Sequence, residues 1–143
     1  EILNWVLRDK TPFLGICRGC QALAIASGGK LHQHIPEVYK DENHGFSEGG
    51  ITYGEIHDQT GHVVYLESGS KIANLTQKDQ ILTNSAHHQS VKSLGDSLIV
   101  TGKTKSGVVE VIEASDLTHF CFGIQSHPEN FVGNDLDCLF REL

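Results

Sequence analysis

The sequence predicts an α/β fold in which a parallel or mixed sheet is flanked by helices. An apolar run at 13–16 leads directly into an apolar helical pattern at 18–27, a succession typical of a parallel α/β sheet. Further short apolar runs between 62 and 125 supply more strands. The 143 residues suffice for one domain that buries about two-thirds of its unfolded surface.

Each element follows from a local pattern. In the first half, Ile2, Leu3, Val6 and Leu7 share a helical face, and Gly28 and Gly29 can cap the second helix. A long loop rich in Gly, His and acidic residues follows, and loops of this length are often functional. The expected elements here are a helix over 1–9, a strand over 13–16, a helix over 18–27 and a loop over 34–61 with a short strand at 50–56.

The second half contains mostly strands. Ser70 can cap a short helix over 71–75, and residues 103–107 can join two strands as a hairpin. Asn134 is the expected N-cap of a last helix over 135–143, whose apolar residues Leu136, Leu139, Phe140 and Leu143 share one face. The expected strands are 62–66, 81–83, 97–102, 108–113 and 120–125.

Composition excludes several classes of function. The net charge of −7 and the lack of a Lys- or Arg-rich stretch argue against nucleic acid or an anionic membrane as partner. No apolar run approaches the ~20 residues of a membrane span. Four cysteines are too few for a disulfide scaffold, so we expect a reducing compartment and a cytoplasmic location.

The chain is organised around residues 15–19, Gly-Ile-Cys-Arg-Gly, where the first strand meets its helix. A nucleophile at the tip of such a turn needs small neighbours, which Gly15 and Gly19 provide. Cys17 stands at a helix N-terminus, where the helix dipole favours a thiolate. The backbone N–H of Arg18 would face an oxyanion formed on attack by Cys17.

Two other interpretations of this stretch stay open. Cys17 and Cys20 form a C-x-x-C pair, a spacing found in redox motifs and in zinc sites. Both cysteines could also be buried as small apolar side chains.

A base for Cys17 is available at the far end of the chain. His127 ends the last strand as Cys17 ends the first, and parallel strands bring their carboxyl ends to one sheet edge. Glu129 could accept a hydrogen bond from one ring nitrogen of His127 while the other faces Cys17. Alone, His-Pro-Glu is more often a turn with a partly exposed histidine, but the elbow favours a triad of Cys17, His127 and Glu129.

The other histidines give weaker signals. His32, His34 and His44 could be metal ligands, but no thiolates stand at zinc spacing, so solvated loop histidines are the favoured interpretation. His57 and His62 are expected at the surface. No metal ion and no other cofactor are expected.

Four segments together resemble the class I glutamine amidotransferase-like hydrolases, and most narrowly the γ-glutamyl-γ-aminobutyrate hydrolase group, peptidase family C26. These segments are residues 14–21, 28–33, 84–89 and 123–129, in the family's order. The resemblance spans nearly the whole chain and implies a flavodoxin-like fold.

The resemblance also implies roles for single residues. Cys17 would attack the γ-carbonyl of a glutamyl amide to give a γ-glutamyl thioester, with His127 transferring protons and Glu129 orienting it. The Arg18 N–H would donate to the oxyanion. The implied contacts to the small-molecule γ-glutamyl substrate are Gln21, His87, His88 and Gln89.

Two departures from the family pattern matter. Cys20 stands where the family has methionine or another larger residue. Several strands and a glycine-rich loop with a second oxyanion donor precede the elbow in the family, whereas sixteen residues precede Cys17 here. We therefore expect residues 1–143 to be the C-terminal portion of the domain, lacking its N-terminal strands, which agrees with the absence of methionine.

Such a portion has expected consequences. Losing one oxyanion donor typically costs about 10²–10³ in rate, so the isolated chain is expected to be inactive or weakly active. Its uncovered sheet edge is expected to pair with the missing section or with another copy. The alternatives to a γ-glutamyl hydrolase are a glutaminase module that passes ammonia to a partner synthase and a catalytically dead binding domain.

Overall fold

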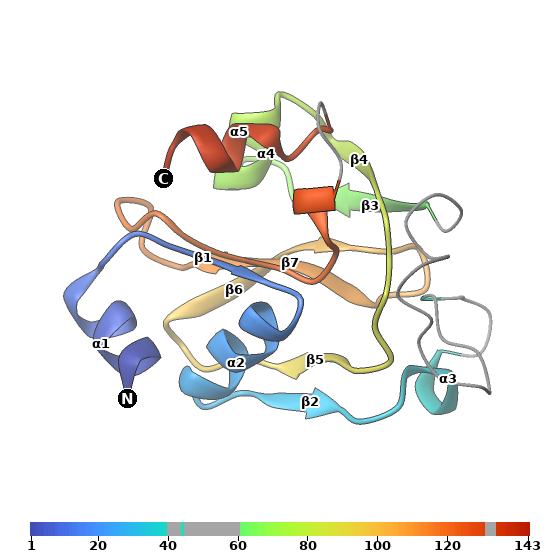
Figure 1. Ribbon diagram of the computed structural model, residues 1–143, viewed down its shortest axis with the longest axis horizontal. Helices are drawn as coiled ribbons and strands as arrows, with labels where there is room; N and C mark the ends of the chain where they lie inside the picture. The colour runs from blue at the N-terminus through green and yellow to red at the C-terminus, as the bar shows by residue number, and fades with distance from the viewer. Residues whose placement is uncertain (40–43, 45–60, 131–133) are drawn as a thin grey trace.

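The computed structural model describes residues 1–39, 44, 61–130 and 134–143, and its centre is a six-stranded mixed sheet (Figure 1). The strand order is β1-β8-β7-β6-β3-β4. The bounds are β1 (Phe13–Ile16), β3 (His62–Leu66), β4 (Gln80–Thr83), β6 (Leu98–Lys103), β7 (Val109–Ala114) and β8 (Cys121–Ile124). The mixed sheet confirms the fold class expected from the sequence.

One parallel pair of strands brings together residues that lie near opposite ends of the sequence. β1 lies parallel to β8, with Gly15 opposite Gly123 and Ile16 opposite Ile124. The other described pairs of this sheet are antiparallel, including the predicted hairpin of β6 and β7. Because β1 and β8 run in the same direction, the residues that follow them leave the sheet at the same edge.

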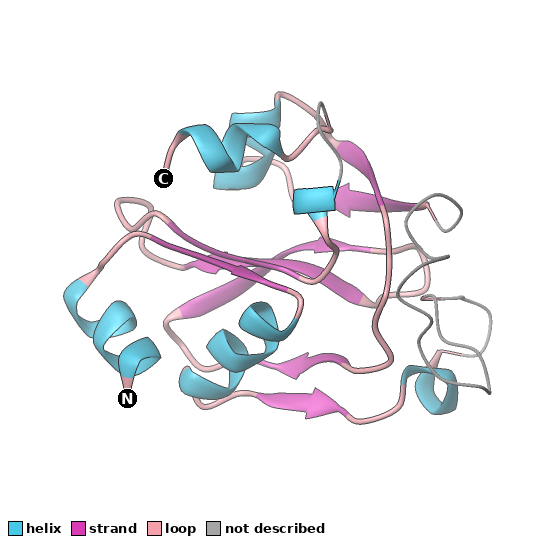
Figure 2. Ribbon diagram, in the orientation of Figure 1, coloured by secondary structure: helices cyan, strands magenta, loops and turns pink. Residues whose placement is uncertain are grey.

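Helices cover both faces of the sheet, as Figures 1 and 2 show. α1 (Ile2–Asp9) and α2 (Arg18–Ala26) lie on one face, and α4 (Lys71–Thr76) and α5 (Asp137–Arg141) lie on the other. Along β8, Cys121 belongs to the core beneath α2, while Phe122 and Ile124 belong to the core beneath α4 and α5. Successive side chains of β8 point to opposite faces of the sheet, so this strand contributes to two separate hydrophobic cores.

The structure adds elements that the sequence patterns did not predict. β2 (Lys30–His32) and β5 (Ser90–Ser93) form a small antiparallel sheet on the α2 side, and α3 (Ile35–Val38) begins within the expected long loop. These segments are too short to show a period of either kind. The strand expected at 50–56 lies outside the described residues.

The last helix differs from its prediction. α5 covers Asp137–Arg141 only, because Asn134 Oδ1 accepts the N–H of Leu136 at 2.7 Å and closes a turn before the helix starts. Leu136 and Leu139 are buried as expected, whereas Phe140 and Leu143 are exposed. In the described part of the chain, no helix has the length and apolar character needed to cross a membrane.

Candidate active site

Cys17 occupies a strained turn between β1 and α2. Its backbone has φ 46° and ψ −99°, a positive-φ conformation that non-glycine residues rarely adopt. The Cys17 N–H donates to the carbonyl oxygen of Ile124 at 2.7 Å, and the Cys17 carbonyl accepts from the N–H of Gln21 at the start of the helix. Strain of this kind is typical of a nucleophile elbow.

The two glycines of the elbow act differently. A Cβ added to Gly15 would lie 2.7 Å from the backbone C and O of Gly19, so Gly15 is needed for β1 to approach α2. A Cβ on Gly19 would meet nothing within 4 Å. The close approach of β1 and α2 thus depends on the missing Cβ of Gly15, whereas no described atom would crowd a Cβ at Gly19.

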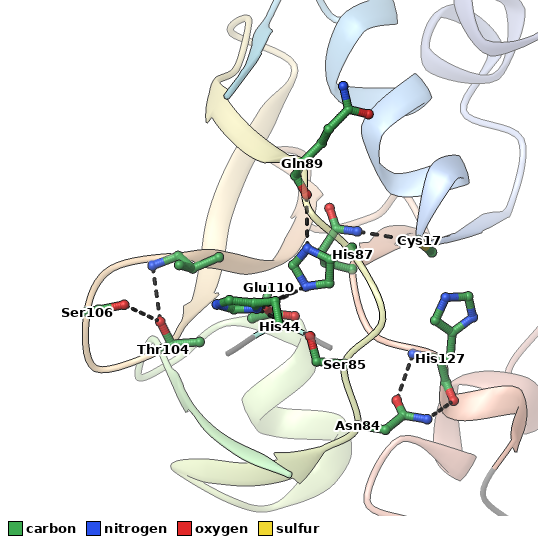
Figure 3. Close-up of polar contacts among 12 residues, drawn as sticks. Cys17, His44, Asn84, Ser85, His87, Gln89, Thr104, Ser106, Glu110 and His127 are labelled. Carbon is green, nitrogen blue, oxygen red and sulfur yellow. Dashed lines mark hydrogen bonds and ion pairs between the residues drawn. The ribbon is translucent and has the colours of Figure 1, made fainter. Parts of the chain in front are cut away.

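His127 stands at the same sheet edge, immediately beyond β8 (Figure 3). Its Nδ1 lies 2.7 Å from Glu129 Oε1, and its ring points toward Cys17. The amide of Asn84 fixes the His127 backbone, since Oδ1 accepts the His127 N–H and Nδ2 donates to the His127 carbonyl, both at 2.8 Å. The structure thus brings Cys17, His127 and Glu129 to one edge of the sheet.

The electrostatics of this pair favour a protonated imidazole. The hydrogen bond to Cys17 raises the pKa of His127 from 6.5 to about 9, with Glu129 adding to the effect and partial burial opposing it. The His127 side chain is 18% exposed, so the pair is only partly screened by water.

A chain of amides approaches Cys17 from the other side. Gln125 Nε2 donates to Cys17 Sγ at 3.6 Å, and Gln125 Oε1 accepts from Gln21 Nε2 at 3.2 Å. The same Gln21 nitrogen donates to the backbone carbonyl of Gln89. Sequence reasoning missed Gln125, although it lies two residues before His127. Gln125 follows β8 directly and lies within the motif segment 123–129, which was the available signal.

The redox interpretation of Cys17 and Cys20 loses its basis. Cys20 is fully buried in the core beneath α2, and burial, followed by the charges of Glu110 and Cys17, raises its pKa well above the usual range. All four cysteines are free. A thiol with a raised pKa and no access to solvent is a poor partner for disulfide exchange.

The residues expected to line the substrate pocket lie in different surroundings. Gln21 is 8% exposed, and His88 and Gln89 are half-buried. His87 is buried, with Nδ1 at 2.9 Å from the Gln89 carbonyl oxygen and Nε2 at 3.2 Å from Glu110 Oε1. The backbone N–H of Arg18 stands in the first turn of α2, where helical N–H groups have no partner within the helix.

Two histidines expected at the surface are less exposed than predicted, one of them buried and the other half-buried. His44 is buried, and its ring packs against that of His62 with 4.4 Å between centroids. His62 is half-buried rather than exposed, because β3 places it beside His44 and His87. His32 is half-buried in β2, and His57 lies outside the described residues.

The sequence matches a protein-family model, described as Peptidase C26, over residues 1–129. It is 34% identical over 142 residues to a Mycobacterium tuberculosis protein named provisionally as a glutamine amidotransferase, covering 99% of this chain and 42% of that protein. It is 33% identical over 130 residues to the γ-glutamyl-γ-aminobutyrate hydrolase of Escherichia coli K12, covering 90% and 50%. The chain thus spans about half the length of the curated relatives it matches.

A solved structure shows the same fold. The crystal structure of a glutamine amidotransferase from Thermotoga maritima matches with a TM-score of 0.64 and 16% identity, covering 99% of this chain and 50% of that one. At this identity the likeness concerns the fold.

Proposed function

Because this chain belongs to the peptidase C26 family, we propose that it is a cysteine hydrolase of γ-glutamyl amide bonds that works through a γ-glutamyl thioester. The observation that carries the proposal is the facing pair of Cys17 and His127, with Glu129 Oε1 2.7 Å from His127 Nδ1. A nucleophile, a base and an orienting carboxylate are the parts that acyl transfer through a thiol requires.

The first half-reaction forms the thioester. The Cys17 thiol gives its proton to His127, its sulfur attacks the γ-carbonyl carbon, and the carbonyl π electrons move to oxygen, where the Arg18 N–H donates to the oxyanion. The intermediate collapses, the carbon–nitrogen bond breaks, and the imidazolium of His127 gives its proton to the leaving amine. A His127 pKa of about 9 supports this assignment, because the imidazole then holds its proton at neutral pH.

The second half-reaction uses the same residues in reverse. Water attacks the thioester carbon while neutral His127 accepts its proton, the carbon–sulfur bond breaks, and the γ-carboxylate product leaves with Cys17 regenerated. Glu129 keeps the imidazole in one orientation and stabilises its protonated form in both halves.

The remaining residues would position Cys17 and the substrate. Gln125, which donates to Cys17 Sγ, would hold the sulfur in place. Gln21 would contact the glutamyl group from one turn beyond the nucleophile. We retain the half-buried His88 and Gln89 as substrate-lining residues, while His87, which faces the interior, would support that segment from behind.

Covalent labelling tests the proposal without requiring full turnover. We expect the glutamine-like electrophile 6-diazo-5-oxo-norleucine to modify the chain once, at Cys17, as located by mass spectrometry of peptides. The Glu129→Gln variant should react about 10²-fold more slowly or worse, because its imidazole loses its ionic partner.

Cys138 provides the matched control. Cys138 is half-buried, as Cys17 is, so a general alkylating reagent should modify both thiols. The glutamine analogue should modify Cys17 and leave Cys138 unmodified. Equal labelling of both thiols, or none at Cys17 in a chain folded by circular dichroism, would overturn the proposal. Glutaminase turnover that appears only after a synthase partner is added would favour the ammonia-transfer alternative.

A further inference from the structure

A second polar cluster, separate from Cys17 and His127, lies in the interior. His44, His62, His87 and Glu110 come from four different parts of the chain, and one ligand atom from each lies within 4.8 Å of the others. Figure 3 shows His44, His87 and Glu110 converging between β7 and the segment 84–89. The exposed fractions of His44, His87 and Glu110 are 3%, 3% and 1%.

The distances within this cluster fit the edges of a tetrahedral metal site. Zinc–nitrogen bonds of about 2.0–2.1 Å place two tetrahedral ligand atoms about 3.3–3.4 Å apart. His44 Nδ1 lies 3.2 Å from His87 Nε2 and 3.5 Å from Glu110 Oε1, and His87 Nε2 lies 3.2 Å from that same oxygen. Three candidate ligand atoms thus already have the mutual spacing that zinc imposes.

The hydrogen bonding of His87 fixes which of its nitrogens can bind a metal. Nδ1 lies 2.9 Å from the carbonyl oxygen of Gln89, which can only accept, so Nδ1 carries the proton. Nε2, which lies 3.2 Å from Glu110 Oε1, is then the ring nitrogen that is available to bind a metal. Histidines that bind metals characteristically donate their other N–H to a backbone carbonyl or a carboxylate in this way.

The buried carboxylate needs a positive partner. Glu110 is almost fully buried, and its Oε2 has no hydrogen-bond partner among the residues that the structure describes. A buried charge is costly unless it is paired or coordinates a metal. One proton can bridge two of the converging lone pairs, whereas a metal ion can accept all of them.

We propose that His44, His62, His87 and Glu110 bind one first-row divalent metal ion, with zinc as the expected ion. Three imidazoles and one carboxylate without a thiolate suit zinc and its neighbours in the series. Four protein ligands close the coordination sphere, so the ion is structural and takes no part in the thiol chemistry.

The ion would join parts of the fold that carry the active site. It would bind β3 through His62, β7 through Glu110, and the segment 84–89 through His87. Within that segment, Asn84 donates a hydrogen bond to the His127 carbonyl, and the Gln89 carbonyl accepts one from Gln21. Loss of the metal is therefore expected to loosen the segment that contacts both sides of the candidate catalytic pair.

Metal content tests the site independently of any activity. The chain, purified from zinc-supplemented medium and dialysed against metal-free buffer, should retain about one zinc per chain by elemental mass spectrometry. Cobalt exchanged into the site should give the visible absorption bands of a tetrahedral ion. Since changes outside the ligand sphere alone cost about 10–100-fold in affinity, Glu110→Gln should weaken binding by more than about 100-fold.

Two control variants and one ligand variant separate the cluster from other possible metal ligands. His32→Ala alters a histidine in β2 outside the cluster, and Cys17→Ser removes the reactive thiol; both should keep the metal. His87→Gln should lose it and unfold at a lower temperature than wild type, with a transition that added zinc no longer shifts. A folded wild-type chain without metal, zinc-insensitive wild-type unfolding, or zinc lost only in Cys17→Ser would overturn the proposal.

Discussion

The protonation of His127 depends mainly on one neighbour. The hydrogen bond to Cys17 is the largest influence that raises its pKa to about 9. We expect Cys17→Ala to lower that pKa toward 6.5, with Glu129 still holding it somewhat above. Titration of the imidazole signals by NMR measures the change, and Cys138→Ala, on the opposite face of the sheet from α2, should leave it unaltered.

The same shift links folding to pH. Between 6.5 and about 9 the folded chain keeps a proton on His127 that the unfolded chain has released, so this contribution to stability is full below pH 6.5 and is lost as pH rises through 9. Cys17→Ala should weaken this alkaline loss of stability in urea titrations. An unchanged His127 titration in Cys17→Ala would contradict the pairing.

Single residues differ in how far the sequence could predict them. Cys17, His127 and Glu129 stand in short motifs whose spacing reflects local chemistry, so their placement was predictable. Asn84, Gln125 and Glu110 act through partners distant in sequence, and no local spacing reports such partners. His44 looked like a solvated loop residue because its burial depends on His62 and His87.

At the scale of elements, the packing of β1 on α2 gives a sharp test. Gly15→Ala would place a Cβ 2.7 Å from the Gly19 backbone, and we expect a loss of about 1–3 kcal/mol or more in the free energy of unfolding. The matched variant Gly19→Ala has open space and a better helix former, so it should be neutral or gain up to about 1 kcal/mol.

Denaturant titration of both variants measures this difference. Labelling of Cys17 should slow in Gly15→Ala, because the displaced turn moves the sulfur away from His127. Equal stability of the two alanine variants would show that the helix can shift to accommodate the extra methyl group, contrary to the expectation.

Elements with a strong local pattern were predictable, and short ones were not. β1, α2, β3, β4 and the hairpin of β6 and β7 each show an apolar run or a turn signal that marks them. β2 and β5 are defined by pairing with each other across a large sequence separation. The end of α5 was overestimated because Phe140 and Leu143 continue the apolar spacing while facing outward.

At the scale of the whole molecule, one sheet separates two cores. Val6 and Leu23 lie in the core beneath α2, and Leu136 and Leu139 lie in the core beneath α4 and α5. Because β7 and β8 contribute to both cores, we expect the two faces to unfold together. The fold class was predictable from the strand–helix succession. The predominance of antiparallel pairs was not, because it depends on which strands lie next to one another in the sheet.

A core variant on one face tests this cooperativity. Leu139→Ala should lower the free energy of unfolding by about 2–5 kcal/mol, whereas Phe140→Ala, 42% exposed, should cost at most about 1 kcal/mol. The single tryptophan, Trp5, lies on α1 across the sheet from Leu139. Its fluorescence and far-UV circular dichroism should report one shared midpoint, lowered equally in Leu139→Ala. A fluorescence midpoint that ignores this substitution would mean that the faces unfold independently.

The segment 84–89 gives the protein a way to adjust reactivity from a distance. Asn84 Oδ1 accepts the backbone N–H of His127. Gln21 Nε2 donates to both the Gln89 carbonyl and Gln125 Oε1, and Gln125 Nε2 donates to Cys17 Sγ. Substitutions within residues 84–89 are therefore expected to change the distance between the Cys17 sulfur and the His127 imidazole while both reacting side chains stay the same.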